Sequence, residues 1–104
     1  MRKLKHPDVA ELDLTTVLHA LADPMRLHIV KVLAAGDPLS CADSCATFQI
    51  PRATLSRHYD TLRRAGLVQS RKEGVMYRNT LRRAELEQRF PGLLDAVLRQ
   101  VMPA

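Results

Sequence analysis

The stretch from Pro51 to Arg83 constrains this chain more than any other part, because it concentrates positive charge. It contains nine Lys and Arg residues and two acidic residues, whereas the remainder contains seven basic and nine acidic residues. The formal net charge of +5 is therefore +7 on this stretch and −2 elsewhere. Charge gathered in this way is typical of a nucleic-acid binding surface. From charge alone, a solvated Arg-rich face that only keeps the protein soluble is the alternative.

The first half of this stretch, PRATLSRHYDTLRRAG, has the pattern of an amphipathic helix. It starts with a proline suited to a first helical turn and ends with a glycine suited to a C-cap. Leu55, Tyr59 and Leu62 fall in one angular sector at about 100° per residue, so they should face the core. The opposite face is small near its N-terminal end and basic beyond it, which suits entry into a major groove about 12 Å wide.

The second half, LVQSRKEGVMYRNT, predicts a two-stranded hairpin. The residues from Leu67 to Arg71 and from Val75 to Thr80 alternate between apolar and polar on either side of Glu73-Gly74. We expect Arg71, Lys72 and Arg78 on or near its tip.

The N-terminal half predicts three more helices. Asp8, with Glu11 three residues later, resembles a capping pair for a first helix whose apolar stripe falls at i, i+3, i+4 and i+7. A second helix starts at Asp23-Pro24, because aspartate suits an N-cap and proline the first helical position. A short third helix ends around Phe48.

Beyond the hairpin, the chain predicts a helix that Phe90-Pro91-Gly92 interrupts, and then a last helix. This last helix is apolar on about half of its circumference, which in so small a chain favours a dimer surface. The alternative is that it folds back on its own domain as ordinary core. Its apolar residues are Leu93, Leu94, Val97, Leu98 and Val101.

Length and composition indicate one domain with an aliphatic core. The chain has 104 residues, of which 46% are apolar, but only two Tyr and two Phe. The sequence contains no apolar run long enough to span a bilayer and no signal peptide, so we expect a cytoplasmic protein without a membrane partner. The two cysteines are expected to be thiols there.

Three motifs, LADPMRLHIVKVL, TLSRHYDTLRRAGLV and RKEGVMYR, occur in order at a spacing that resembles the ArsR/SmtB family of bacterial winged-helix repressors. The resemblance covers roughly residues 14–81. It implies a mainly α fold with a small β-hairpin, a winged helix-turn-helix of order α-α-α-α-β-β-α. Residues 1–104 would form one domain, with dimerisation helices in 1–22 and 82–104, the helix-turn-helix in 39–66 and the wing in 67–80.

The resemblance also implies a function: a homodimer that binds an imperfect palindrome in double-stranded DNA as a repressor and leaves it when an inducer binds. Two recognition helices related by a two-fold axis should meet major grooves about 34 Å apart. The family's DNA contacts correspond to Arg52, Thr54, Ser56, Arg57, His58, Arg71, Lys72 and Arg78, although His58 is equally suited to packing. The corresponding dimer contacts are Leu14, Leu18, Leu93, Leu94, Val97, Leu98 and Val101.

The inducer site is where the sequence departs from the family. The Cys-x-Cys pair of arsenic-sensing members falls on Ser40 and Ala42, and the last helix offers Asp95 but none of the histidines of zinc-sensing members. Cys41 and Cys45 lie four apart on one helical face, where they would bind a soft metal ion with another ligand, oxidise, or simply pack as small apolar residues. Metal, thiol oxidation and a small molecule all stay open as the signal.

Other classes of protein have weaker support in the sequence. It contains no nucleophile-base set, Gly-rich phosphate loop or HExxH motif, so we do not expect an enzyme. A winged-helix module that binds an acidic protein is the main alternative. A dithiol redox protein using Cys41 and Cys45 is weaker, because their spacing is not Cys-x-x-Cys.

Overall fold

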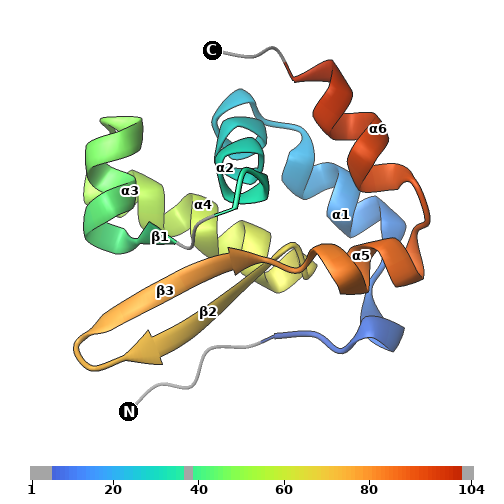
Figure 1. Cartoon of the computed structure of the whole chain (residues 1–104), viewed down its shortest axis with the longest axis horizontal. Coiled ribbons are helices and arrows are strands. Elements are labelled where there is room, and N and C mark those ends of the chain that lie inside the picture. The colour runs from blue at the N-terminus through green and yellow to red at the C-terminus, as the bar shows by residue number, and fades with distance from the viewer. Residues whose placement is uncertain (1–5, 37–38, 102–104) are drawn as a thin grey trace.

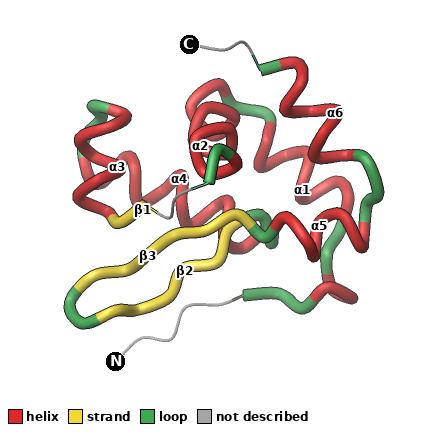
Figure 2. The backbone as a smooth tube through the Cα atoms, viewed as in Figure 1, coloured by secondary structure: helices red, strands yellow, loops and turns green. Residues whose placement is uncertain are grey.

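The fold is mainly helical with one small sheet (Figures 1 and 2), as the sequence predicts. The structure is a computed structural model that describes residues 6–36 and 39–101, without the side chains of residues 39–42. A 3-10 helix at Val9–Glu11 precedes α1 (Leu14–Leu21), α2 (Pro24–Ala34), β1 (Leu39–Ser40), α3 (Cys41–Phe48), α4 (Arg52–Ala65), β2 (Val68–Glu73), β3 (Met76–Leu81), α5 (Arg83–Arg89) and α6 (Leu93–Gln100).

Helix α1 begins later than the sequence pattern predicts. Its N-cap is Asp13, whose Oδ2 accepts hydrogen bonds from the Thr16 backbone N–H at 3.1 Å and from the Thr15 hydroxyl at 2.7 Å. These bonds hold the pKa of the Asp13 carboxyl below its ordinary value. Asp8 and Glu11 instead bracket the 3-10 helix, where the Asp8 N–H donates to Glu11 Oε1 at 2.8 Å. The prediction that this pair starts the first helix was wrong, because Asp13 lies nearer the apolar stripe and caps it.

The start of α2 is confirmed. Asp23 Oδ2 accepts a hydrogen bond from the Arg26 backbone N–H at 3.0 Å, and Pro24 occupies the first helical position. Such a cap satisfies one of the N–H groups that every helix start leaves without an intrahelical partner. Only two residues separate α1 from α2, so the two helices meet in a tight corner, here called the α1–α2 corner.

The hairpin belongs to a three-stranded antiparallel sheet of order β1-β3-β2. Arg71 lies opposite Arg78 and Glu73 opposite Met76, so Gly74 and Val75 form the turn. The short strand β1 was not predicted, because two residues carry no periodicity. Its pairing with β3 joins the start of α3 to the hairpin, which extends away from the helices in Figure 1.

The core is aliphatic and packs between the helices and the base of the hairpin. The predicted inner face of α4 is confirmed, with Leu55, Tyr59 and Leu62 at most 2% exposed. The other buried apolar residues are Leu12, Val17, Ala20, Leu21, Ile29, Val30, Leu33, Phe48, Ala65, Leu67, Val68, Leu86 and Leu94. Each helix from α1 to α6 therefore contributes buried residues to one shared core, and α3 does so through Phe48.

Gly66, which ends α4, supports a prediction about stability. Its φ is +92°, and a Cβ added there would clash with Leu12 Cδ2 in the core. Gly92 has a similar φ of +81°, but no described atom lies within 4 Å of its added Cβ. We expect Gly92→Ala to cost about 1 kcal/mol of unfolding free energy, the usual cost of a left-handed alanine. Gly66→Ala should cost roughly 3 kcal/mol, because overpacking is added. Urea unfolding of both variants measures this, and equal losses would contradict the predicted clash.

Candidate DNA-binding surface

Helix α4 exposes a polar and basic face opposite the residues that it buries. Arg52, Thr54, Ser56 and Arg57 are all exposed, so every one of these predicted contacts is available to a partner. Ser56 is small and Arg57 long, and hydroxyl and guanidinium groups both reach phosphates and base edges. The outer face of α4 therefore has the shape and chemistry of a recognition helix.

The hairpin adds a second basic surface. Arg71, Lys72 and Arg78 are exposed, as predicted. Arg71 and Arg78 are direct cross-strand partners, and like charges in that position destabilise a sheet. Glu73 offsets part of this repulsion through an ion pair with Arg78, with Nε 2.9 Å from Oε1. An anionic partner such as a DNA backbone would relieve the rest.

His58 lies on the flank of α4, half-buried. Its Nδ1 is 3.3 Å from Nη1 of Arg26, which belongs to the first turn of α2. The same guanidinium donates through Nε to the Ala20 carbonyl and lies 3.5 Å from the His19 carbonyl through Nη2, both at the end of α1. The packing role of His58 is thus visible, whereas its contact with DNA stays a prediction. The sequence could not predict this contact, because Arg26 and His58 are 32 residues apart.

Asp23 lies at the same corner. The hydrogen bond from the Arg26 backbone N–H, with the positive charge of the Arg26 side chain nearby, holds the pKa of Asp23 below its ordinary value. The carboxylate therefore stays charged at neutral pH and keeps the cap of α2 in place.

A buried hydrogen bond fixes α4 against α3. Ser44 is fully buried, and its Oγ lies 2.7 Å from the Tyr59 hydroxyl. The sequence left Ser44 unexplained, since an apolar residue would suit its position in the helix-turn-helix. The structure explains it: Tyr59 brings a hydroxyl into the core, and buried hydroxyls require a partner.

A second polar network joins α4 to the base of the hairpin. Arg63 Nε donates to Ser70 Oγ at 3.1 Å, and Ser70 Oγ donates to Asn79 Oδ1 at 2.6 Å. The Ser70 backbone N–H also donates to His6 Nε2 at 3.0 Å. Burial and the positive charge of Arg63 lower the pKa of His6, which favours the neutral ring that accepts this bond. The hairpin is therefore oriented with respect to α4 by buried or half-buried bonds.

A cleft of about 380 Å³ separates α4 from β3. Arg52 and Ser56 line it from α4, and Tyr77 lines it from β3. The sequence reading missed Tyr77, since its alternation in the strand does not tell which side chain faces the helix. The Tyr77 phenol and the Arg52 side chain therefore place hydrogen-bonding groups in the cleft between the two basic surfaces.

Arg82, in the positively charged stretch from Pro51 to Arg83, is buried and therefore not available to a DNA partner. Arg82 is 8% exposed, and its Nε and Nη2 donate to the two carboxylate oxygens of Glu85 at 2.9 and 2.7 Å. These hydrogen bonds hold the pKa of Glu85 below its ordinary value. The charge of Arg82 is thus neutralised inside the fold by Glu85. The surface of residues 51–83 therefore carries less positive charge than their composition indicates.

Of the two cysteines, Cys45 is the one whose side chain the structure describes. Cys45 is a free thiol, half-buried and packed against the core. The side chain of Cys41 lies outside the described residues. Among the side chains that are described, no three His, Cys, Asp or Glu residues are grouped to hold a metal ion. A soft metal ion or thiol oxidation at Cys41 and Cys45 stays a prediction.

The predicted dimer contacts divide into two groups. Leu14 and Leu18 on α1 are 46% and 43% exposed, which is unusual for leucine and suits an interface. In α6 and at its end, Leu93, Val97, Leu98 and Val101 are half-buried. Leu94 is a correction: at 4% exposed it belongs to the core of its own protomer and has almost no surface to offer a partner.

Taken together, an α3–α4 pair with an outward basic helix, followed by a basic hairpin tied to that helix, defines a winged helix-turn-helix DNA-binding protein. No helix within residues 6–36 and 39–101 is long and apolar enough to cross a membrane.

Comparisons with known proteins agree with this class. Residues 21–71 match the family model of a helix-turn-helix domain. The chain is 34% identical over 82 residues to the HTH-type transcriptional regulator YceK of Bacillus subtilis, covering 78% of this chain and 82% of that protein. It is 40% identical over 62 residues to an arsenical resistance operon repressor of Staphylococcus xylosus, covering 60% of this chain and 59% of that protein.

Solved structures give the same answer for the fold. HlyU of Vibrio cholerae superposes with a TM-score of 0.69 at 29% identity, covering 83% of this chain and 88% of that one. The transcriptional regulator HlyU of Vibrio vulnificus superposes with a TM-score of 0.67 at 30% identity, covering 86% and 88%. The chain belongs to the ArsR/SmtB family of winged helix-turn-helix transcriptional regulators, and it is not an enzyme.

The Ser44–Tyr59 bond supports a prediction about the helix-turn-helix. Ser44→Ala should lower the unfolding free energy by about 1 to 3 kcal/mol, because it removes a partner of a buried hydroxyl. Tyr59→Phe should be destabilising for the same reason, and the double variant should lose less than the sum of the two. Urea unfolding of the four proteins gives the coupling energy. Strict additivity would mean that the two hydroxyls do not interact.

Proposed function

We propose that this regulator is a homodimeric repressor that binds an imperfect palindrome in double-stranded DNA and is released by an inducer. The observation that carries the proposal is the pair of exposed basic surfaces on the outer face of α4 and on the hairpin, which the Arg63–Ser70–Asn79 bonds hold in one orientation. Arg57 lies on the surface of the helix and Arg71 on that of the hairpin. A helix of this composition suits the major groove, and the hairpin suits the neighbouring phosphates.

Dimerisation through α1 and α6 is supported by where apolar side chains remain exposed. Leu14 and Leu18 lie on the outer face of α1, and neither is needed to close the protomer's own core. A two-fold axis through such a face would repeat the same contacts on both subunits and relate two α4 helices to each other. This is the arrangement that a palindrome requires.

The binding proposal is tested by selecting duplexes from a random pool and measuring affinity by fluorescence anisotropy between 50 and 200 mM salt. Sequence-selective binding that weakens steeply with salt is expected, since several phosphates are contacted. If no duplex is preferred over the starting pool, the alternative of a module for an acidic protein gains the advantage. One of the relatives described above is named as a repressor, which favours binding to DNA.

We expect Arg57→Ala to weaken binding to the selected duplex by about 10-fold or more, since a guanidinium bound to a base edge contributes about 1 to 3 kcal/mol. Arg99→Ala provides the matched control, because Arg99 is also an exposed arginine but lies on α6. Its binding should stay within about 2-fold of wild type. Equal effects of the two substitutions would remove Arg57 from the contact surface.

We expect Leu14→Glu combined with Leu18→Glu to yield folded monomers in sedimentation velocity, because four carboxylates would meet at the two-fold axis. Val97 and Leu98 are less suitable for this test, since both also pack against the protomer's core. Val75→Glu is the control, as Val75 is 98% exposed at the tip of the hairpin. A double variant that sediments as a dimer would place the interface elsewhere.

A further inference from the structure

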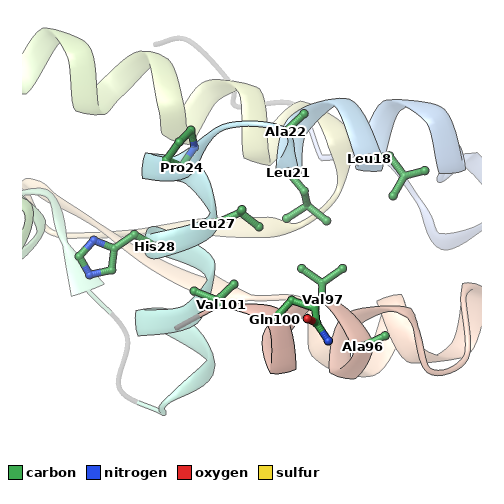
Figure 3. Close-up of a pocket in the computed structure, with 10 residues that line it drawn as sticks. All are labelled: Leu18, Leu21, Ala22, Pro24, Leu27, His28, Ala96, Val97, Gln100 and Val101. Atoms are coloured by element: carbon green, nitrogen blue, oxygen red, sulfur yellow. The ribbon is translucent and has the colours of Figure 1, made fainter. Parts of the chain in front are cut away.

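An open apolar groove of about 770 Å³, here called the cavity, lies between α1, α2 and α6 (Figure 3). These three helices lie away from the tip of the hairpin in Figure 1. Leu18 and Leu21 line the cavity from α1, Leu27 from α2 and Val97 from α6. In Figure 3 these side chains come from opposite sides of the space, with the α1–α2 corner facing α6. Its volume is within the range of about 300 to 1,000 Å³ that small-molecule sites occupy.

The wall formed by α6 is held in place from outside the cavity. Lys31 Nζ on α2 donates to the Val101 carbonyl at 3.0 Å, which fixes the end of the helix. Arg83 on α5 lies 3.4 Å from Asp95 near its start. Leu94, the one α6 residue that is fully buried, anchors the helix from its other face. These contacts therefore hold α6 in position without a ligand in the cavity.

The lining specifies the chemistry of a ligand. It is aliphatic apart from two polar tips, His28 on α2 and Gln100 on α6, and contains no carboxylate, ammonium or guanidinium group. A buried charge without a partner is costly, so a charged molecule is a poor occupant. A neutral, mostly apolar molecule of one or two rings, with one hydrogen-bonding group that reaches Gln100 or His28, fits this arrangement.

We propose that this cavity binds a neutral apolar small molecule, and that this molecule is the inducer; the second part rests on the proposed function. The link to DNA is the α1–α2 corner. Leu21 and Pro24 line the cavity from either side of this corner. Arg26, within the corner, holds the end of α1 through the Ala20 carbonyl and reaches His58 on α4. A ligand that displaces the corner therefore displaces the recognition helix.

The competing occupant is a second copy of the chain, because Leu18, Val97 and Val101 line the cavity and also belong to the predicted dimer surface. A helix of the partner is convex and about 10 to 12 Å across. It would cover the mouth of a cavity whose walls are three helices of one protomer, rather than fill it. Covering the mouth increases the burial of a bound ligand, so the dimer and the ligand site are compatible.

The first experiment measures binding of N-phenyl-1-naphthylamine, a neutral aromatic probe with one N–H group, to the 104-residue protein by the fluorescence of the probe. Saturable binding of one probe per chain is expected. Ala96→Phe, which places a ring in the cavity, should weaken it at least 10-fold. Ala84→Phe is the control, since Ala84 is an exposed helical alanine on α5. Absence of saturable binding, or equal binding by Ala96→Phe and wild type, would overturn the site.

The second experiment measures affinity for the selected duplex with and without saturating probe. Wild type should bind DNA at least 5-fold more weakly with the probe, as expected for typical coupling between two sites. Arg26→Lys keeps the charge but loses the planar fork, so it should bind the probe normally while the probe changes its DNA affinity less than 2-fold. A probe that binds wild type without changing its DNA affinity would overturn the inducer role. Because probe-free DNA binding is measured separately, failure of the proposed function is distinguished from failure of this inference.

Discussion

The division of α4 into a buried apolar face and an exposed basic face is the constraint on which the rest of this structure depends. A basic helix gains little from its own charges, so the core must hold it through Leu55, Tyr59 and Leu62. The Ser44–Tyr59 bond adds direction to this packing, because a buried hydroxyl pair has one favourable geometry whereas aliphatic contacts tolerate sliding. Helix α3 is thereby a fixed support for the helix that faces DNA.

The hairpin depends on the same helix. The Arg63, Ser70 and Asn79 network ties its base to α4, so the two basic surfaces share one orientation and do not move as separate arms. Farther out, Arg71 and Arg78 oppose each other across the strands, at a cost to the hairpin itself. Stability near the base and repulsion near the tip are what a surface selected for an anionic partner would show.

Features of the fold and the site that depend on residues close together in the sequence could be predicted, whereas features that depend on residues far apart could not. The α4 face, the start of α2 at Asp23 and the turn after Glu73 are local patterns, and the structure confirms them. Asp8 was a local pattern too, but it caps the separate 3-10 helix, and Asp13 caps α1. The strand β1, the Ser44–Tyr59 bond and the burial of Arg82 by Glu85 depend on tertiary pairing or packing. Leu94 shows the same limit: its stripe was clear, but only packing tells which of its residues the protomer keeps.

The α1–α2 corner connects the cavity with the recognition helix α4. Asp23 caps α2 through the Arg26 backbone, and the Arg26 side chain then spans the end of α1 and His58 of α4. One residue therefore takes part in a helix start, a helix end and the recognition helix. Because these groups share a single guanidinium, a shift of α1 relative to α2 cannot leave all of its contacts intact. Switches between bound and released states repack such contacts in discrete steps, so a change at this corner would act on α4 through the contact between Arg26 and His58.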